Sequence, residues 1–212
     1  MKYLLKTGII LFLFSIIFTS CVKEKKKIVV EKPQNYLSYD GKVYEMSQCY
    51  FYNVPDTVVN SNQDSVYYWG VILFSPGVNV TIGNSGAIET MSGTGSGISL
   101  NLVSSKFPNS FVPGNYVIEN SPSMIDIPET ISSSTGFFDY DIDADVGAVM
   151  DFINGEVTVS GAGSVIELKL LIEDENGNVL EGYYKGGFEQ IIPNFNKKSI
   201  LLEKNNILKA RK

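Results

Sequence analysis

The strongest constraint on this chain is an internal repeat of alternating apolar and polar residues. Residues 66–119 and 134–187 align without a gap at an offset of about 68 residues. Alternation with a period of two is typical of strands that bury one face. The repeat therefore predicts an all-β fold, namely a single antiparallel β-sandwich or open barrel built from two similar meander units over residues 36–192. Convergence on common strand motifs is the alternative explanation of the match.

Each unit is expected to contain four short strands and one Gly-x-Gly turn. The turns are Gly93-x-Gly95 and Gly161-x-Gly163, and no helical pattern follows them, which argues against phosphate-binding loops. An Ile-x-Leu-x-Leu segment follows each turn, and its apolar side chains are expected to line the core. These matching stripes are Ile98, Leu100, Leu102, Ile166, Leu168 and Leu170. Asn-Gly at 176–177 predicts a tight hairpin between two further strands.

The first twenty residues carry the pattern of an export signal. Two lysines precede an apolar run over residues 8–18, which is shorter than the roughly 20 residues that span a membrane. The run ends in Phe-Thr-Ser before Cys21, which resembles the lipobox of bacterial lipoproteins, although that motif more often has Leu where Phe18 stands. The resemblance implies that residues 1–20 are a cleaved signal peptide and that acyl chains on Cys21 anchor the protein. An ordinary cleaved signal and an uncleaved anchor are the alternatives.

The histidine and cysteine content excludes several chemistries. The chain contains no His, so it cannot build a Ser-His-Asp or Cys-His site or a His-ligated zinc site by itself. After acylation of Cys21, Cys49 is the only other thiol, so no intramolecular disulfide can form. The apolar and aromatic neighbours of Cys49 predict that it is buried inside a strand.

The charges are divided by segment. Residues 33–193 carry four lysines against twenty acidic residues, a balance that excludes nucleic acid as a partner. The flanking segments are basic. Residues 21–35 are expected to form a lipid-anchored tether, and residues 193–212 a disordered C-terminal extension. Contact of the tether with anionic lipid headgroups is the alternative to a solvated linker.

The sharpest polar feature is a row of four acidic residues: Asp139, Asp141, Asp143 and Asp145. If this segment is extended, a period of two places all four carboxylates on one side of a strand. Calcium takes six to eight oxygen ligands, so the row is a candidate calcium site, although its spacing does not fit an EF-hand loop. A solvated edge that blocks association between strands is the alternative.

Tyr67, Tyr68 and Trp69 are candidate ligand contacts. Adjacent side chains of a strand point to opposite faces, so at least one of the three is expected to lie outward, where it could stack on a sugar or bind a protein. Filling of the sandwich core is the alternative. Glycosidase chemistry would need two carboxylates at a set separation, and a sequence does not give that separation.

Several turn and strand motifs resemble those of a group of uncharacterised β-rich lipoproteins of Bacteroidetes over about residues 36–190. They are residues 93–100 followed by 113–116, and residues 155–160 followed by 182–186. The resemblance implies a β-sandwich in the cell envelope and brings no known active site. Surface lipoproteins of that phylum often have acidic residues just after the acylated Cys, whereas residues 22–27 here are basic. The periplasmic and the surface-facing locations therefore both stay open.

We therefore expect a lipoprotein of the outer membrane that acts as a non-catalytic binding or assembly module. Its ligand is expected to be a glycan, a protein partner or calcium, with no other cofactor. A carboxylate-based hydrolase such as a glycosidase is the alternative function.

Overall fold

A computed structural model of the chain describes residues 32–60, 65–108, 111–118 and 127–193. The regular structure in these ranges consists of twelve strands and no helix, so the all-β prediction is confirmed. Accordingly, no helix that could cross a membrane occurs in this part of the chain. The predicted signal peptide, Cys21, most of the tether and the extension after residue 193 lie outside the described residues.

The strands follow one another along the chain between Tyr36 and Gln190. They are β1 (Tyr36–Tyr39), β2 (Lys42–Glu45), β3 (Gln48–Val59), β4 (Ser65–Phe74), β5 (Val78–Ile82), β6 (Ile88–Ser104), β7 (Gly114–Ile118), β8 (Thr130–Asp141), β9 (Val146–Ala162), β10 (Val165–Asp174), β11 (Val179–Gly187) and β12 (Glu189–Gln190).

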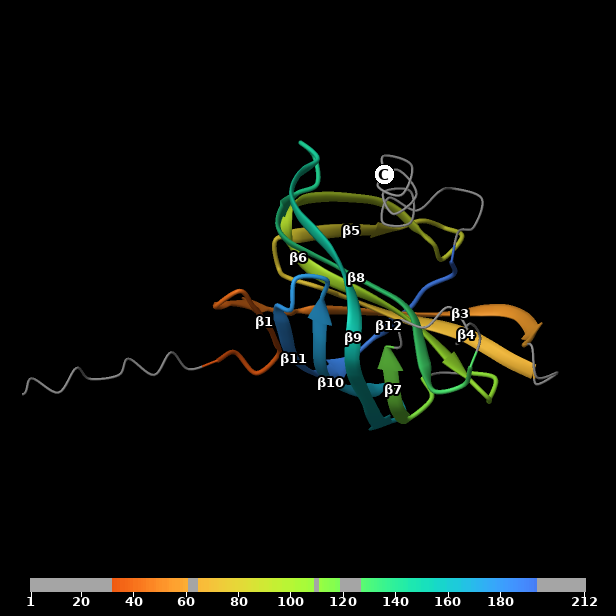
Figure 1. The fold of residues 1–212 in the computed structure, drawn as a ribbon. Coiled ribbons are helices and arrows are strands. Elements are labelled where there is room, and N and C mark those ends of the chain that lie inside the picture. Colours follow the sequence, from red (N-terminus) through yellow and green to blue (C-terminus); the bar gives the residue numbers. More distant parts are fainter. Residues whose placement is uncertain (1–31, 61–64, 109–110, 119–126, 194–212) are drawn as a thin grey trace, which may run out of the picture. The chain divides into compact units, whose positions relative to one another are not determined.

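All twelve strands belong to one bent sheet (Figure 1). The order is β12-β3-β4-β6-β8-β7-β9-β10-β11-β1-β2, with β5 paired to β6 alone. The two terminal strands, β12 and β2, do not pair with each other, so the described sheet is not closed into a barrel. Most pairings are antiparallel, but β7 with β8 and β12 with β3 are parallel, which corrects the prediction of a wholly antiparallel sheet.

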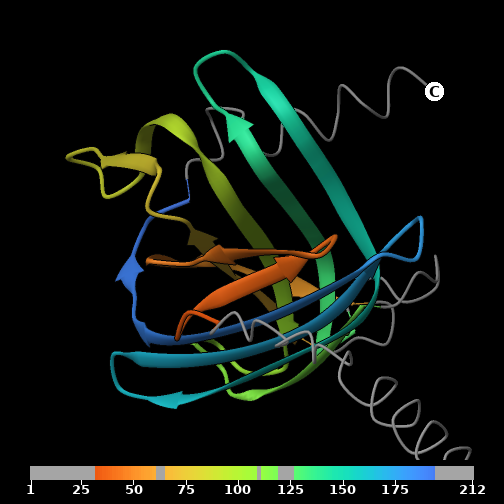
Figure 2. The ribbon, with the colours of Figure 1, turned by 90° about the vertical axis from the view of Figure 1, so that its left-hand side faces the viewer.

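The bend brings strands that are far apart in the sheet onto a common core (Figure 2). The ring of Tyr39 in β1 stacks on Phe138 in β8, with ring centroids 4.7 Å apart. Trp69 in β4 meets Tyr116 in β7 edge to face at 5.6 Å. The six predicted stripe residues are all buried in this core, which confirms the predicted facing of both Ile-x-Leu-x-Leu segments. Cys49 is buried there too, as expected, and burial raises the pKa of its thiol.

The second predicted unit forms a meander. Strands β8, β9, β10 and β11 pair in sequence order, each antiparallel to the next. A two-residue turn at Gly163 and Ser164 joins β9 to β10, and Gly163 has a positive φ of 61°, which a residue without Cβ adopts readily. The predicted Asn-Gly hairpin joins β10 to β11, with Gly177 at φ 80°.

The first predicted unit folds differently. Residues 88–104 form one continuous strand, β6, so the turn predicted at Gly93-x-Gly95 is wrong. These glycines instead allow the segment before β5 to lie close to β6: a Cβ on Gly93 would lie 2.5 Å from the backbone oxygen of Gly77, and a Cβ on Gly95 would lie 2.5 Å from Oγ of Ser75. In addition, β7 pairs with β9 and β8 rather than with β6, so this unit is not a four-stranded meander.

Candidate functional site

The predicted acidic row lies in the hairpin that joins β8 to β9. Asp139 and Asp141 belong to the end of β8, whereas residues 142–145 form a turn before β9 begins at Val146. The prediction of four carboxylates on one side of an extended strand is therefore wrong. Figure 2 shows this hairpin extending beyond β1, β2, β10 and β11.

Local chemistry of aspartate explains the turn. Asp139 and Asp145 have positive φ angles of 48° and 60°, a region that Asp tolerates better than most residues. Oδ1 of Asp141 accepts a hydrogen bond from the backbone N–H of Ala144 at 2.9 Å, which closes the turn. The row therefore favours a turn over a continued strand.

Each carboxylate of the row has its own partner. Lys42 of β2 forms an ion pair with Asp139 at 2.7 Å. The backbone N–H of Gly93 donates to Asp143 at 2.9 Å, and the hydroxyl of Tyr140 donates to Asp145. Across the described ranges, no three His, Cys, Asp or Glu side chains form a group that could hold a metal ion. The structure thus does not bring the four predicted calcium ligands together.

The start of β9 leaves one edge of the sheet unpaired. Residues 146–151 pair with β8 on one side. On the other side, pairing with β10 begins only at Phe152, opposite Asp174, and β7 pairs with residues 155–159. No described strand therefore pairs with the outer side of residues 146–150, which we call the β9 edge.

The β9 edge is uncharged and partly exposed. Its sequence is Val-Gly-Ala-Val-Met, and Val146 is 65% exposed. Val149 and Met150 are half-buried and pack against the apolar clusters on the two faces of the sheet. A Cβ on Gly147 would lie 2.6 Å from Cα of Tyr140, so this position accepts no side chain. Strand β2, at the end of the sheet, instead carries Lys42 and Glu45, charges of the kind that protect edges from association.

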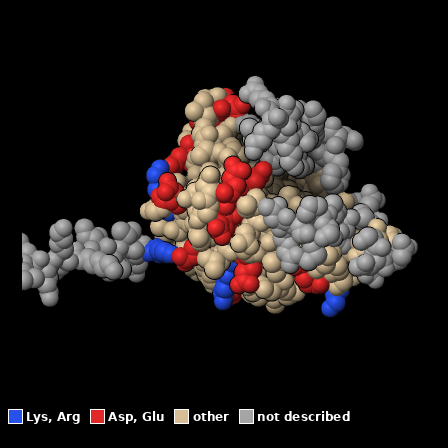
Figure 3. Space-filling view, in the orientation of Figure 1, with Lys and Arg blue, Asp and Glu red and all other residues tan. Residues whose placement is uncertain are grey.

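Acidic side chains surround the β9 edge. The four aspartates of the row precede it, and the exposed Asp151 follows it and accepts a hydrogen bond from Thr135 at 2.7 Å. Figure 3 shows acidic side chains near the top of the view, over this hairpin. The edge is therefore an apolar backbone segment with negative charge at both ends.

The three aromatic candidates do not form one surface. Trp69 is fully buried, with its ring 5.8 Å from that of Phe51, so it has no exposed surface for a ligand. Tyr67 is half-buried and packs edge to face on Phe107, which is 45% exposed, at 5.5 Å. Tyr68 is also half-buried and lies on the opposite face of β4 from Trp69, as alternate residues do.

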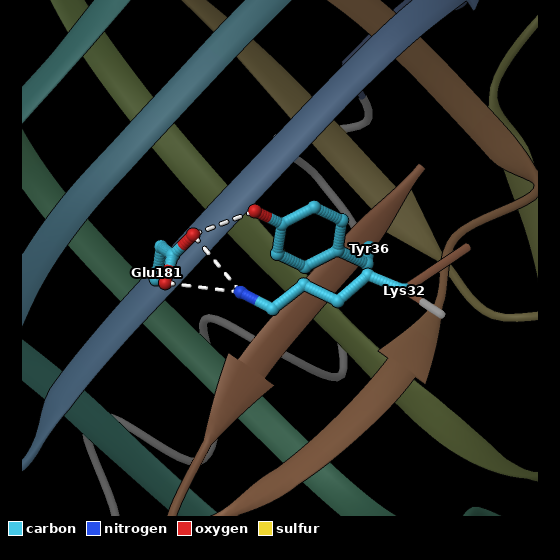
Figure 4. Close-up of polar contacts among 3 residues, drawn as sticks. All are labelled: Lys32, Tyr36 and Glu181. Carbon is cyan, nitrogen blue, oxygen red and sulfur yellow. Dashed lines mark hydrogen bonds and ion pairs between the residues drawn. The ribbon is translucent and has the colours of Figure 1, made fainter. Parts of the chain in front are cut away.

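A polar cluster on the outer face of β1 and β11 escaped the sequence analysis. Nζ of Lys32 lies 3.0 Å from Oε1 of Glu181, and the hydroxyl of Tyr36 donates to the same oxygen at 2.6 Å (Figure 4). The Lys32 ammonium also lies 4.4 Å from the centre of the Tyr36 ring. The Tyr36 hydroxyl and the Lys32 ammonium lower the pKa of Glu181. The participants are about 150 positions apart, so no local signal predicts the cluster.

A second missed site is the buried carboxylate of Asp174 at the end of β10. Tyr39 donates to it through the hydroxyl, as do the side-chain amide of Asn178 and the backbone N–H groups of Asn176 and Asn178. Burial raises the pKa of Asp174, but these hydrogen bonds outweigh burial and lower it to about 2. Every donor comes from the β10–β11 turn or from β1, so the role of this carboxylate is structural: it closes the turn and joins it to β1.

Comparisons with models of protein families, with curated proteins and with solved structures find no match to this chain. The resemblance to lipoproteins of Bacteroidetes therefore stays a prediction from sequence motifs.

Proposed function

We propose that this protein is a lipid-anchored envelope lipoprotein that acts as a non-catalytic assembly module. In this proposal the β9 edge binds a protein partner, which adds one of its own strands to the sheet. The observation that carries the proposal is the uncharged backbone of residues 146–150, whose outer side pairs with no described strand although residues 155–159 of the same strand pair on both sides.

Strand addition suits an edge of this kind. The outward N–H and C=O groups of an edge strand are a template for another chain, and main-chain hydrogen bonds then supply most of the affinity. Proteins usually block such edges with charge or proline, and β2 carries the charges Lys42 and Glu45. The β9 edge carries neither along residues 146–150, so the chemistry favours an edge that is kept available for a partner.

Three carboxyl groups of the described residues have a shifted pKa, and each of them serves a structural contact. A glycosidase needs a general acid whose pKa is raised. Within the described ranges the groups with a shifted pKa are Glu167, Asp174 and Glu181, and hydrogen bonds lower the pKa of each of them. These three side chains therefore hold ion pairs and turns, and the hydrolase alternative gains no support from them.

We also propose that the bent sheet folds over on itself to form the two layers of a β-sandwich. Strands β3, β4 and β6 would form one layer, and β7, β9, β10 and β11 the other. The contact of Trp69 in β4 with Tyr116 in β7 supports two facing layers, because these strands are not neighbours in the sheet. Such a scaffold would hold the β8–β9 hairpin rigidly at its margin.

Anchoring is tested at Cys21. We expect Cys21→Ala to move the protein from the outer-membrane fraction to the soluble fraction, because the acyl chains supply the attachment. Cys49→Ala is the matched control, since Cys49 is buried and should leave the location unchanged. Retention of the Cys21→Ala protein in the membrane fraction would contradict lipid anchoring.

Partner binding is tested with the full chain purified from membranes. Peptides are selected on it from a random display library, and hydrogen exchange then maps where each selected peptide binds. We expect bound peptides to slow amide exchange within residues 146–150. Selected peptides that slow exchange only elsewhere would overturn the β9 edge as the binding site.

A further inference from the structure

We propose that the segment captured at the β9 edge is an extended peptide with an uncharged, β-branched centre and a Lys or Arg at each end. This inference rests on the proposed function and adds the chemical class of the partner.

The length of the edge sets the spacing of the basic residues. Asp145, the last residue of the turn, and Asp151 flank the five uncharged residues, and a strand of five to six residues spans about 16–20 Å. An added strand pairs residue by residue, with opposite Cβ atoms about 4.5–5.5 Å apart. Basic side chains about six positions apart would therefore lie opposite carboxylates at both ends of the edge.

The charges of the hairpin select a basic partner over a second copy of this chain. Asp141 and Asp143 accept hydrogen bonds from backbone N–H groups, which satisfy the oxygens without neutralising the charge. If two β9 edges paired antiparallel, Asp145 of one copy would lie near Asp151 of the other. Like charges directly opposite each other are destabilising in a sheet, so self-pairing is disfavoured.

The small side chains of the edge determine which residues fit at the centre of the partner segment. Gly147 and Ala148 present little side chain, and both are exposed. A partner residue opposite them therefore has room for a branched side chain, and β-branched residues also favour the extended conformation. Val or Thr in the middle of the added strand fits this space.

Three synthetic peptides test the inference on the full chain. The probe is Lys-Val-Thr-Val-Thr-Val-Lys, and its matched controls carry Ser or Glu in place of both Lys residues. Each cross-strand ion pair contributes about 0.5 kcal/mol, so two pairs make the Lys peptide about fivefold tighter than the Ser peptide at low salt. We expect the Glu peptide to bind most weakly and the preference for Lys to shrink as salt is added.

Charge-neutralising variants show which carboxylates cause the preference for the Lys peptide. Asp145→Asn with Asp151→Asn keeps a side-chain acceptor at both positions and should reduce the Lys preference to less than twofold. The control is Glu156→Gln with Glu167→Gln, which removes two charges from parts of strands β9 and β10 that lie farther from the β9 edge and should keep the preference. If the aspartate variant unfolds, the wild-type protein provides the test. A preference for the Lys peptide that does not shrink as salt is added would then contradict an electrostatic origin.

The outcomes separate the two proposals. Equal binding of the Lys and Ser peptides, with slowed exchange within residues 146–150, would overturn the basic partner and keep the proposed function. A Lys preference that survives Asp145→Asn with Asp151→Asn would place the basic residues elsewhere on the acidic surface and overturn the inference as well. Failure of all three peptides to slow exchange at the edge would count against the proposed function itself.

Discussion

The hydroxyl of Tyr39 in β1 donates a hydrogen bond to Oδ2 of Asp174 in β10 at 2.5 Å, and both side chains are buried. Strand β11 lies between β1 and β10 in the sheet, so this bond reaches across a strand. The same tyrosine ring stacks on Phe138 of β8. Tyr39 therefore links the end of the bent sheet to the β10–β11 turn and to the base of the β8–β9 hairpin.

Removal of the Tyr39 hydroxyl should destabilise the protein. Tyr39→Phe keeps the ring stack but leaves a buried carboxylate without one of its donors, which costs about 1.5–3 kcal/mol. Urea unfolding measures the loss. Tyr36→Phe is the matched control, because its hydroxyl also donates to a carboxylate, that of Glu181, but at an exposed site where the loss should be smaller. Equal losses in the two variants would contradict the structural role of Tyr39.

Asp174 should make stability depend on pH in the acidic range. Its pKa is about 2 in the folded protein, below the value of about 3.9 for an unfolded Asp. The stabilisation is therefore fully present above about pH 4 and is lost as the pH falls toward 2. Melting temperatures of the wild type and Asp174→Asn should differ most near pH 6 and converge between pH 4 and 2. A constant difference over that range would contradict the lowered pKa.

Two leucines of β10 should respond oppositely to truncation. Leu168 is fully buried, whereas Leu171 is 55% exposed on the other face. Leu168→Ala should cost about 2–5 kcal/mol, because it leaves a cavity in the core. Leu171→Ala should change stability by no more than about 0.5 kcal/mol. Chemical denaturation of both variants checks this, and a small loss for Leu168→Ala would place its stripe on the surface.

Calcium should have little effect on the melting temperature. The four aspartates of the row have separate partners, and the described part of the chain offers no group of three ligands. The measurement compares millimolar calcium with chelator at matched ionic strength, so that plain screening cancels. A rise of several degrees that disappears in Asp141→Asn with Asp143→Asn would instead establish the calcium site predicted from the sequence.

Local patterns predicted local structure well. The alternation of Ile166, Leu168 and Leu170 placed them in the core, and Gly163 and Gly177 lie in hairpin turns. A side-chain pattern with period two reports which face of a strand is buried, and that property does not depend on the neighbouring strand.

Non-local features could not be predicted in the same way. Gly95 looks like a turn residue, but its lack of a side chain allows a close approach to Ser75, and only the pairing of strands shows this. The bond between Tyr39 and Asp174 joins residues 135 positions apart. The β9 edge begins where the pairing of β10 with β9 stops, and the sequence of β9 alone does not show where that is.

The most direct test of the account is hydrogen exchange of individual amides in the full chain without a partner. In an antiparallel pair, alternate N–H groups point away from the neighbouring strand. Alternate amides within residues 146–150 should therefore exchange rapidly, while those of Leu168 and Leu170, between β9 and β11, should be strongly protected. Protection of every amide from 146 to 150 in the isolated chain would show that the β9 edge is already paired and would contradict its role as a binding site.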